Sequence, residues 1–185
     1  MSKIGRKKIQ IPDNTNIEIL HNIIKVSGPL GELKFNFKSH LKIEKKDNIL
    51  KIIPQKQTKY VRSLYGLTRS IVYNMIEGVT KGFRKQLELS GVGFRVQISG
   101  SKLTFSLGFS HPIEYEIPEG INIKIEKNII TINGIDKQKV GQTAAEIKHL
   151  KIPDPYKAKG IKYFGEEIKT KPGKAVAKTM GEGEK

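Results

Sequence analysis

Four histidines are among the side chains of this sequence that could act as general bases or metal ligands. His21, His40, His111 and His149 lie in unrelated contexts, without a metal-ligand spacing such as H-x-x-x-H. The chain has no cysteine that could complete a zinc site or form a disulfide. His111, in GFSHP, stands out because a tight loop between two strands would project its side chain. It has no identifiable acidic or nucleophilic partner, so an ordinary loop residue is the better interpretation.

Two further patterns have only a superficial likeness to catalytic motifs. The segment SGVGFRV at 90–96 contains G-x-G, but it lacks the third glycine and the following helix of a dinucleotide site. Glu114 and Glu116 alternate with Ile113 and Tyr115, so they belong to the solvent face of a strand and not to an acid/base pair. We therefore expect no enzymatic activity, no cofactor and no metal.

Positive charge is the dominant feature of the composition. The 34 Lys and Arg residues exceed the 18 Asp and Glu residues, which leaves a net charge of +16. Residues 1–82 hold 16 basic and 6 acidic side chains, residues 83–150 hold 9 and 7, and residues 151–185 hold 9 and 5. Nucleic acid is the commonest polyanion that relieves such repulsion. A basic helix lying on a membrane is less suitable, because the cations are spread over strands and tails.

The sequence also argues against export and membrane insertion. No apolar run approaches the roughly 18 residues that cross a bilayer. The basic start MSKIGRKKIQIP leads into polar residues instead of the hydrophobic stretch of a signal peptide. We expect an intracellular protein that does not associate with membranes and is not a homo-oligomer.

The segment PDPYKAKGIKYFGE at 153–166 follows the last expected helix. Between Lys157 and Lys178 there are seven lysines but only two acidic residues, and Tyr156, Tyr163 and Phe164 lie among them or next to them. Ammonium groups on an extended backbone can follow phosphates, and tyrosines can stack on unpaired bases. A disordered, solubilising end is the alternative. Prolines and aromatics favour binding, because proline reduces the entropy lost on docking.

Hydrophobic periodicity divides the rest of the chain into strands and two helices. Period-two alternation predicts strands near 17–20, 23–26, 33–37, 41–44, 49–53, 103–109, 113–117, 121–125 and 130–132, which turn residues join into antiparallel hairpins. Spacing of three and four predicts a helix over 59–81 and a second over 137–150. Asp136 is the expected N-cap of the second helix, and Pro153 enforces its end.

The order of these elements indicates an internal duplication. An offset of 106 residues gives the stronger local match, but it would place the first helix on a segment that contains Pro172 and Gly173. An offset of 80 aligns strands and helix together, so we prefer it. The predicted fold is α+β: two tandem similar domains, residues 1–82 and 83–152, each a small antiparallel sheet packed by one helix. Residues 153–185 form an extended basic tail, surplus to folding and free to bind.

Several motifs resemble the bacterial-type large-subunit ribosomal protein six family. They are GPLGEL at 28–33, GLTRSIVYNMIEGVTKGF at 66–83, GVGFRV at 91–96, LGFSHPI at 107–113, DKQKVGQTAAEIK at 136–148 and above all PDPYKAKGIKY at 153–163. The resemblance is collinear and extends to about Lys174. It implies a structural constituent of the large ribosomal subunit that binds large-subunit ribosomal RNA and supports subunit assembly and translation. The implied position is the stalk base, by the sarcin-ricin loop where translation GTPases dock, beside neighbouring ribosomal proteins.

The resemblance also implies which residues contact RNA. The second domain and the C-terminal extension provide most contacts in the family, which points to Tyr156, Lys157, Lys159, Gly160, Lys162, Tyr163, Lys169, Lys171 and Lys174. Further candidates are Gly91, Arg95, Ser110, His111, Lys139, Gln142, Lys3, Arg6 and Lys7. The family usually has glycine where Ala158 stands, and a methyl group is tolerated there unless the backbone adopts positive φ or touches RNA. The final MGEGEK has no family counterpart, and we expect it to be mobile.

Two other functions stay open on sequence grounds. A free-standing RNA or DNA chaperone would use the same basic surface, and an RNA-modifying enzyme would use His111. The expected compartment is the bacterial cytoplasm, within the ribosome, with a plastid stroma as the alternative.

Overall fold

The first unit, residues 3–82, folds its period-two segments into two antiparallel sheets. A computed structural model of the chain describes residues 3–172. One sheet has the order β1-β6-β5 and the other β2-β3-β4. The strands are β1 (Ile9–Gln10), β2 (Asn16–Leu20), β3 (Ile23–Gly28), β4 (Gly31–Asn36), β5 (Leu41–Lys46) and β6 (Ile49–Pro54). The short α1 (Lys3–Arg6) precedes them, and α2 (Lys59–Thr80) follows and covers their apolar face.

The second unit, residues 83–164, repeats this arrangement. Its sheets have the orders β10-β9-β8 and β11-β12-β7-β13, with α3 packed on β7, β12 and β13. Its elements are β7 (Phe83–Ser90), β8 (Arg95–Ser99), β9 (Lys102–Ser106), β10 (Ile113–Glu116), β11 (Ile121–Glu126), β12 (Ile129–Gly134), α3 (Lys137–Leu150) and β13 (Gly160–Tyr163). Each unit therefore divides its strands between two sheets instead of the single sheet we expected.

The duplication at an offset of 80 residues is confirmed by the strand bounds. Leu41–Lys46 corresponds to Ile121–Glu126, and Ile49–Pro54 corresponds to Ile129–Gly134, residue for residue. The sheet order β1-β6-β5 recurs as β7-β12-β11, and β2-β3-β4 recurs as β8-β9-β10. The match at 106 residues is a chance resemblance between hairpins.

Both predicted helices form where their caps and apolar stripes place them. Thr58 caps α2 by accepting from the Val61 N–H at 3.2 Å, and Asp136 caps α3 by accepting from the Gln138 N–H at 2.8 Å. The buried face of α3 is Val140, Thr143, Ala144 and Ile147. None of the helices within residues 3–172 is long and apolar enough to span a bilayer.

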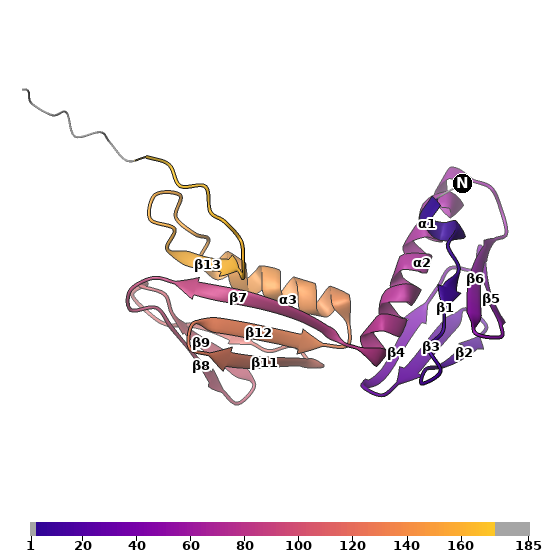
Figure 1. Ribbon diagram of the computed structural model, residues 1–185, viewed down its shortest axis with the longest axis horizontal. Helices are drawn as coiled ribbons and strands as arrows, with labels where there is room; N and C mark the ends of the chain where they lie inside the picture. Colours follow the sequence, from indigo (N-terminus) through magenta and orange to yellow (C-terminus); the bar gives the residue numbers. More distant parts are fainter. Residues whose placement is uncertain (1–2, 173–185) are drawn as a thin grey trace, which may run out of the picture.

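Strand β13 corrects the expectation that the fold is complete by residue 150. Gly160–Tyr163 pairs antiparallel with β7, with Ile161 opposite Leu89, and the Ile161 side chain is fully buried in the second core. The first part of the predicted tail thus belongs to the second unit, because β7 would otherwise be an open edge beside an uncovered patch of the core. Figure 1 shows β13 lying along β7 next to α3.

The two units meet where α2 ends and α3 begins. Figure 1 shows the two helices diverging from this junction, so the far ends of the units lie well apart. The Leu30 N–H donates to the Val79 carbonyl at 3.1 Å and ties the β3–β4 turn to the last turn of α2. Only Lys81 and Gly82 connect α2 to β7.

Candidate nucleic-acid interface

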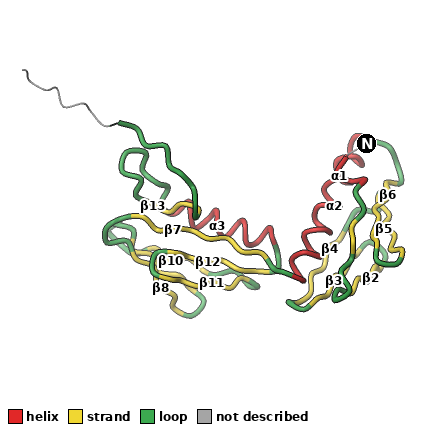
Figure 2. The backbone as a smooth tube through the Cα atoms, in the orientation of Figure 1, coloured by secondary structure: helices red, strands yellow, loops and turns green. Residues whose placement is uncertain are grey.

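The loop 153–159, called the distal loop here, is a closed structure and not a loose exit from α3. The Asp154 carboxylate accepts from the Tyr156 N–H at 3.0 Å, and the Asp154 carbonyl accepts from the Ala158 N–H at 2.8 Å. The Asp154 N–H in turn donates to the Lys159 carbonyl at 3.0 Å. These bonds leave Tyr156, Lys157 and Lys159 exposed on the outside of the loop. Figure 2 shows the loop projecting beyond α3 and β13.

Ala158 adopts the backbone conformation in which a methyl group is unfavourable. Its φ is +53°, in the left-handed region that glycine occupies at little cost. Alanine at position 158, where the resemblance implies glycine, therefore introduces strain into the distal loop.

Gly160 has a packing role in the structure. A Cβ at this position would lie 2.6 Å from the Pro153 Cα, so only glycine allows the two sides of the distal loop to meet. Ile161 follows directly, and its N–H donates to the Lys151 carbonyl at 2.8 Å. Gly160 thus closes the loop at its base, which differs from the RNA contact implied by the resemblance.

Lys162 and Tyr163 are occupied by contacts within the second unit. The Lys162 ammonium pairs with Glu88 of β7 at 3.2 Å. The ammonium group of Lys148 lies 4.7 Å from the centroid of the Tyr163 ring, and that of Lys85 lies 5.5 Å from it. Both residues anchor β13, so we place them at the base of the candidate surface and not at its contact edge.

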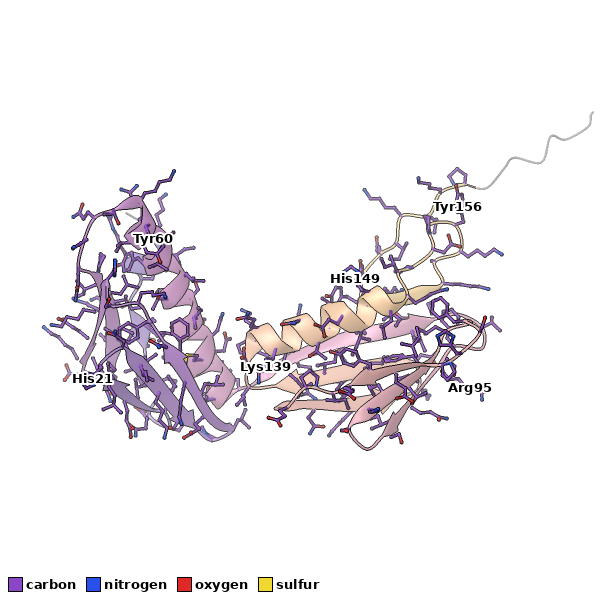
Figure 3. All side chains as sticks on the ribbon, turned by 180° about the vertical axis from the view of Figure 1, so that it is seen from behind. His21, Tyr60, Arg95, Lys139, His149 and Tyr156 are labelled. Carbon is purple, nitrogen blue, oxygen red and sulfur yellow. The ribbon has the colours of Figure 1, made fainter. Side chains whose placement is uncertain are left out.

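Two loops of the second unit reach the same end as the distal loop. A Cβ at Gly91 would lie 2.6 Å from the Phe94 ring, and one at Gly108 would lie 3.5 Å from it, so this ring joins the 91–94 turn to the 107–112 loop. Ser90 pairs with Gly160 across the sheet. The predicted residues Gly91, Arg95, Ser110 and His111 are therefore grouped near the base of the distal loop; Figure 3 shows Arg95 at this end.

The structure adds residues that the sequence did not single out. The Lys151 ammonium lies 4.1 Å from the centroid of the Phe109 ring, which connects the end of α3 to the 107–112 loop. Val92 is 90% exposed at the tip of its turn, and Ile152 is 61% exposed. Exposed aromatic side chains between cations can stack on bases, and exposed aliphatic ones can pack against bases or sugars. In the sequence, the only signal for these exposed apolar residues was Val92, which lies between two glycines.

The chain beyond β13 returns to the distal loop. The Lys171 N–H donates to the Pro155 carbonyl at 2.9 Å, which places Lys171 beside the loop, and Lys169 is exposed two residues earlier. Lys174 and the final MGEGEK lie outside the described residues. We call the exposed cations and rings of residues 91–95, 107–112, 151–159 and 169–171 the distal surface.

Within residues 3–172, the exposed cations of the distal surface are not compensated by ion pairs. Within residues 3–172, none of Arg95, Lys157, Lys159, Lys169 and Lys171 forms an ion pair. The nearby carboxylate of Glu166 is already occupied, because Lys148 donates to both of its oxygens at 2.7 and 2.8 Å. Hydrogen bonds from Lys148 and from the Tyr163 N–H lower the pKa of Glu166. The surface is thus free to bind anionic groups.

Lys139 and Gln142 lie at the other end of α3, beside the junction. Lys139 donates to the Glu119 carbonyl at 3.4 Å, and Gln142 donates to Glu146 at 2.9 Å. Glu146 also accepts from the Tyr115 hydroxyl, and burial together with this bond raises the pKa of Tyr115 to about 12.

The 14 residues of α3 separate the junction end of this helix from the distal loop end by about 21 Å. Figure 3 shows Lys139 and Tyr156 at opposite ends of the helix.

The remaining predicted residues, Lys3, Arg6 and Lys7, lie in the first unit. They belong to α1 and the residue after it, at the end of α2 far from the junction. All three side chains are exposed. The structure therefore divides the candidate residues into a distal surface, a pair at the start of α3 and a group on the first unit.

The site has the character of a binding surface, formed by exposed cations and rings on a rigid α+β support. Within residues 3–172, no group of three or more His, Asp and Glu side chains is placed to hold a metal ion. The family model for ribosomal protein L6 matches residues 11–82 and 90–164, so the chain belongs to this family. The second range ends one residue after β13, in agreement with its place in the second unit.

Three bacterial relatives extend this match over almost the whole chain. The protein of Persephonella marina is 47% identical over 179 residues, which cover 96% of this chain and 100% of the relative. Those of Dictyoglomus turgidum and Methylorubrum extorquens are 46% and 47% identical and cover 96% and 94% of this chain, and 100% and 99% of the relatives. Each is named large ribosomal subunit protein uL6. The family is structural and non-enzymatic, which confirms the expected absence of catalysis.

Proposed function

We propose that this chain is a structural constituent of the large ribosomal subunit and binds large-subunit ribosomal RNA directly through its distal surface. The observation that carries the proposal is the distal loop, where Tyr156, Lys157 and Lys159 are exposed and held by internal hydrogen bonds. A surface ordered before binding loses little conformational entropy when it meets RNA. The protein acts in the cytoplasm as part of the ribosome and has other ribosomal proteins as neighbours.

The position within the subunit follows from the family resemblance of the motifs at 107–113 and 153–163. It is the stalk base, near the sarcin-ricin loop and the region where translation GTPases dock. At this position the chain supports subunit assembly and holds RNA by positioning contacts to phosphates, which carry no sequence information by themselves.

Tethered cleavage tests both parts of the proposal. The sequence has no cysteine, so Val92→Cys provides a unique attachment site for a hydroxyl-radical probe at the distal surface. In reconstituted large subunits we expect cleavage of ribosomal RNA at the sarcin-ricin region. Cleavage confined to other RNA would refute the position, and a protein that sediments mostly free of subunits would support a free-standing chaperone.

A charge-matched pair of variants tests the contact residues. Lys157→Gln with Lys159→Gln removes two cations of the distal surface, while Lys45→Gln with Lys46→Gln removes two exposed cations of β5. If each distal lysine contacts a phosphate, the slope of log affinity against log salt for isolated large-subunit RNA falls by about 1.4–1.8. The β5 variant should keep the original slope. Equal slopes for the two variants would contradict the assignment.

A further inference from the structure

The sheet β1-β6-β5 of the first unit lacks a strand that its copy in the second unit has. The second sheet has the order β11-β12-β7-β13, so β7 is paired on both sides, whereas its counterpart β1 is paired only with β6. The other edges of the first unit, β2, β4 and β5, correspond to β8, β10 and β11, which are edges as well. Within residues 3–172, β1 is therefore the edge whose counterpart is covered by a further strand.

Gln10 of β1 corresponds to Glu88 of β7. Gln10 lies opposite Ile49, and Glu88 lies opposite Ile129, which is the residue that the offset of 80 assigns to Ile49. On its other side Glu88 pairs with Lys162 of β13. The position that binds the fourth strand in the second unit is thus occupied by Gln10 in the first.

The main chain of Gln10 points to the side on which the fourth strand would lie. The Ile11 N–H donates to the Asn48 carbonyl at 2.8 Å, toward β6. Successive residues of an antiparallel strand direct their N–H and C=O groups to opposite sides, so those of Gln10 point away from β6. In the second unit the groups on this side bind β13 and the residue after it, since the Phe164 N–H donates to the Gln86 carbonyl at 3.0 Å.

A groove of about 480 Å³ lies beside β1, between this strand and the second half of α2. Its apolar lining includes Pro12, Tyr73 and Ile76, and Tyr73 is 43% exposed. In the second unit β13 lies in the comparable position, in contact with both β7 and α3, and its Ile161 side chain is fully buried. A strand docked along β1 would pack an aliphatic side chain against Tyr73 and Ile76 in the same way.

The charges of the groove favour a strand that carries carboxylates. Lys8 and Lys81 line the groove, together with a single acidic residue, Glu77. In the part of the chain that the structure describes, neither lysine forms an ion pair. Lys162 of β13 is matched by a carboxylate of β7 at 3.2 Å, whereas Gln10 is neutral. The complementary occupant is therefore a peptide with its own acidic side chain, opposite in charge to β13.

Pro12 restricts this edge to one short strand. Proline has no N–H to donate, and the Pro12 carbonyl already accepts from the Thr15 N–H at 3.0 Å. Proline and lysine at a sheet edge oppose open-ended association. A second copy of this chain would bring Lys8 and Lys81 close to the same cations of its partner, so self-association is unfavourable.

We propose that the edge of β1 and the adjacent groove bind an extended segment of a neighbouring protein of the large ribosomal subunit, which adds a fourth strand to the sheet. The segment pairs its main chain with Gln10 and packs an aliphatic side chain against Tyr73 and Ile76. Its carboxylate lies beside Lys8 and Lys81. In strand addition the main-chain bonds supply affinity, and the side-chain contacts supply specificity. The inference rests on the proposed function, because its partner belongs to the same subunit.

Photo-cross-linking from the groove identifies the occupant. The sequence has no cysteine, so Glu77→Cys provides a unique attachment site for a benzophenone on the α2 side of the groove. In reconstituted large subunits we expect a cross-link to a segment of another ribosomal protein that has an aliphatic residue next to Asp or Glu. A cross-link only to RNA or to a second copy of this chain, or no cross-link, overturns the inference. If the Val92→Cys probe cleaves no ribosomal RNA, the proposed function itself fails.

Gln10→Pro tests the main-chain pairing. Proline removes the N–H that points away from β6, which an edge strand tolerates. We expect the yield of the Glu77→Cys cross-link to fall by about tenfold in the Gln10→Pro protein and to persist in the matched control Gln10→Thr. Unchanged hydrogen exchange of the β6 amides confirms that β1 still pairs with β6. Equal yields in the two variants overturn the inference.

A pair of tyrosines tests the packing without any change to the strand. Tyr73→Ala removes the ring that lines the groove, whereas Tyr60→Ala removes a ring that is 56% exposed at the other end of α2. The yield of the Glu77→Cys cross-link should fall by about fivefold in the first variant and stay the same in the second. Cleavage of ribosomal RNA from position 92 should be unaffected by Tyr73→Ala. Equal cross-link yields in the two variants contradict the inference.

Discussion

Ile161→Ala is the most direct test of whether the segment after α3 is part of the fold. Ile161 is fully buried and lies in the second core with Leu87, Leu89 and Ile147. Truncating a buried isoleucine to alanine costs about 2–5 kcal/mol, because the transfer free energy is lost and a cavity remains. With a urea m-value of about 2 kcal/mol/M, the unfolding midpoint of the second unit should fall by about 1–2.5 M.

Hydrogen exchange with mass spectrometry gives the readout, because the two units can be followed separately. Amides of β7 and β13 should exchange faster in the variant, while those of α2 serve as an internal reference in the first unit. Ile152→Ala is the matched control, since Ile152 is 61% exposed and a surface change alters stability by about 0.5 kcal/mol or less. Unchanged exchange in β7 would show that β13 does not belong to the core and that the division at residue 152 is correct.

Two further predictions concern strain and pH. Ala158→Gly relieves a left-handed backbone that costs about 1–2 kcal/mol, against about 0.5–1 kcal/mol for glycine's added freedom in the unfolded chain. Thermal unfolding should show a gain of up to about 1.5 kcal/mol, and a clear loss would contradict the assigned conformation. Lys148 and the Tyr163 N–H lower the pKa of Glu166, so its contribution to stability is present at neutral pH and lost as pH falls through the folded pKa. Glu166→Gln should therefore unfold at a lower temperature than the original protein at pH 7, with a smaller difference at about pH 3; a difference that does not change with pH refutes this linkage.

Periodicity predicted the elements that bury a regular stripe. The nine strands expected from alternation and both helices are present, since each has enough apolar residues to show its period. Strand β7 escaped prediction because FRKQLELS has only Leu87 and Leu89 as buried apolar residues. Strand β13 escaped because four residues with a single fully buried aliphatic side chain have no measurable period.

The sequence predicted which kinds of residue form the candidate surface, but not which of them lie together in the fold. Lysines and tyrosines after Pro153 indicated RNA, yet nothing in the sequence showed that Lys162 pairs with Glu88 across two strands. Gly160 and Ala158 illustrate the same limit. The resemblance implied that Gly160 contacts RNA and that Ala158 stands where glycine is usual, but only the Pro153 contact and the φ of +53° show that Gly160 closes the loop and Ala158 strains it.

The position of β13 explains how a short basic segment can bind RNA with useful affinity. A disordered tail with the same lysines would have to order each residue on docking, at about 1–2 kcal/mol of backbone entropy per residue. Here α3 fixes one end of the distal loop, and pairing of β13 with β7 fixes the other. The folding free energy of the second unit has therefore already ordered Tyr156, Lys157 and Lys159. Stability and RNA affinity should then be coupled through Ile161, although its side chain lies in the core and not on the distal surface.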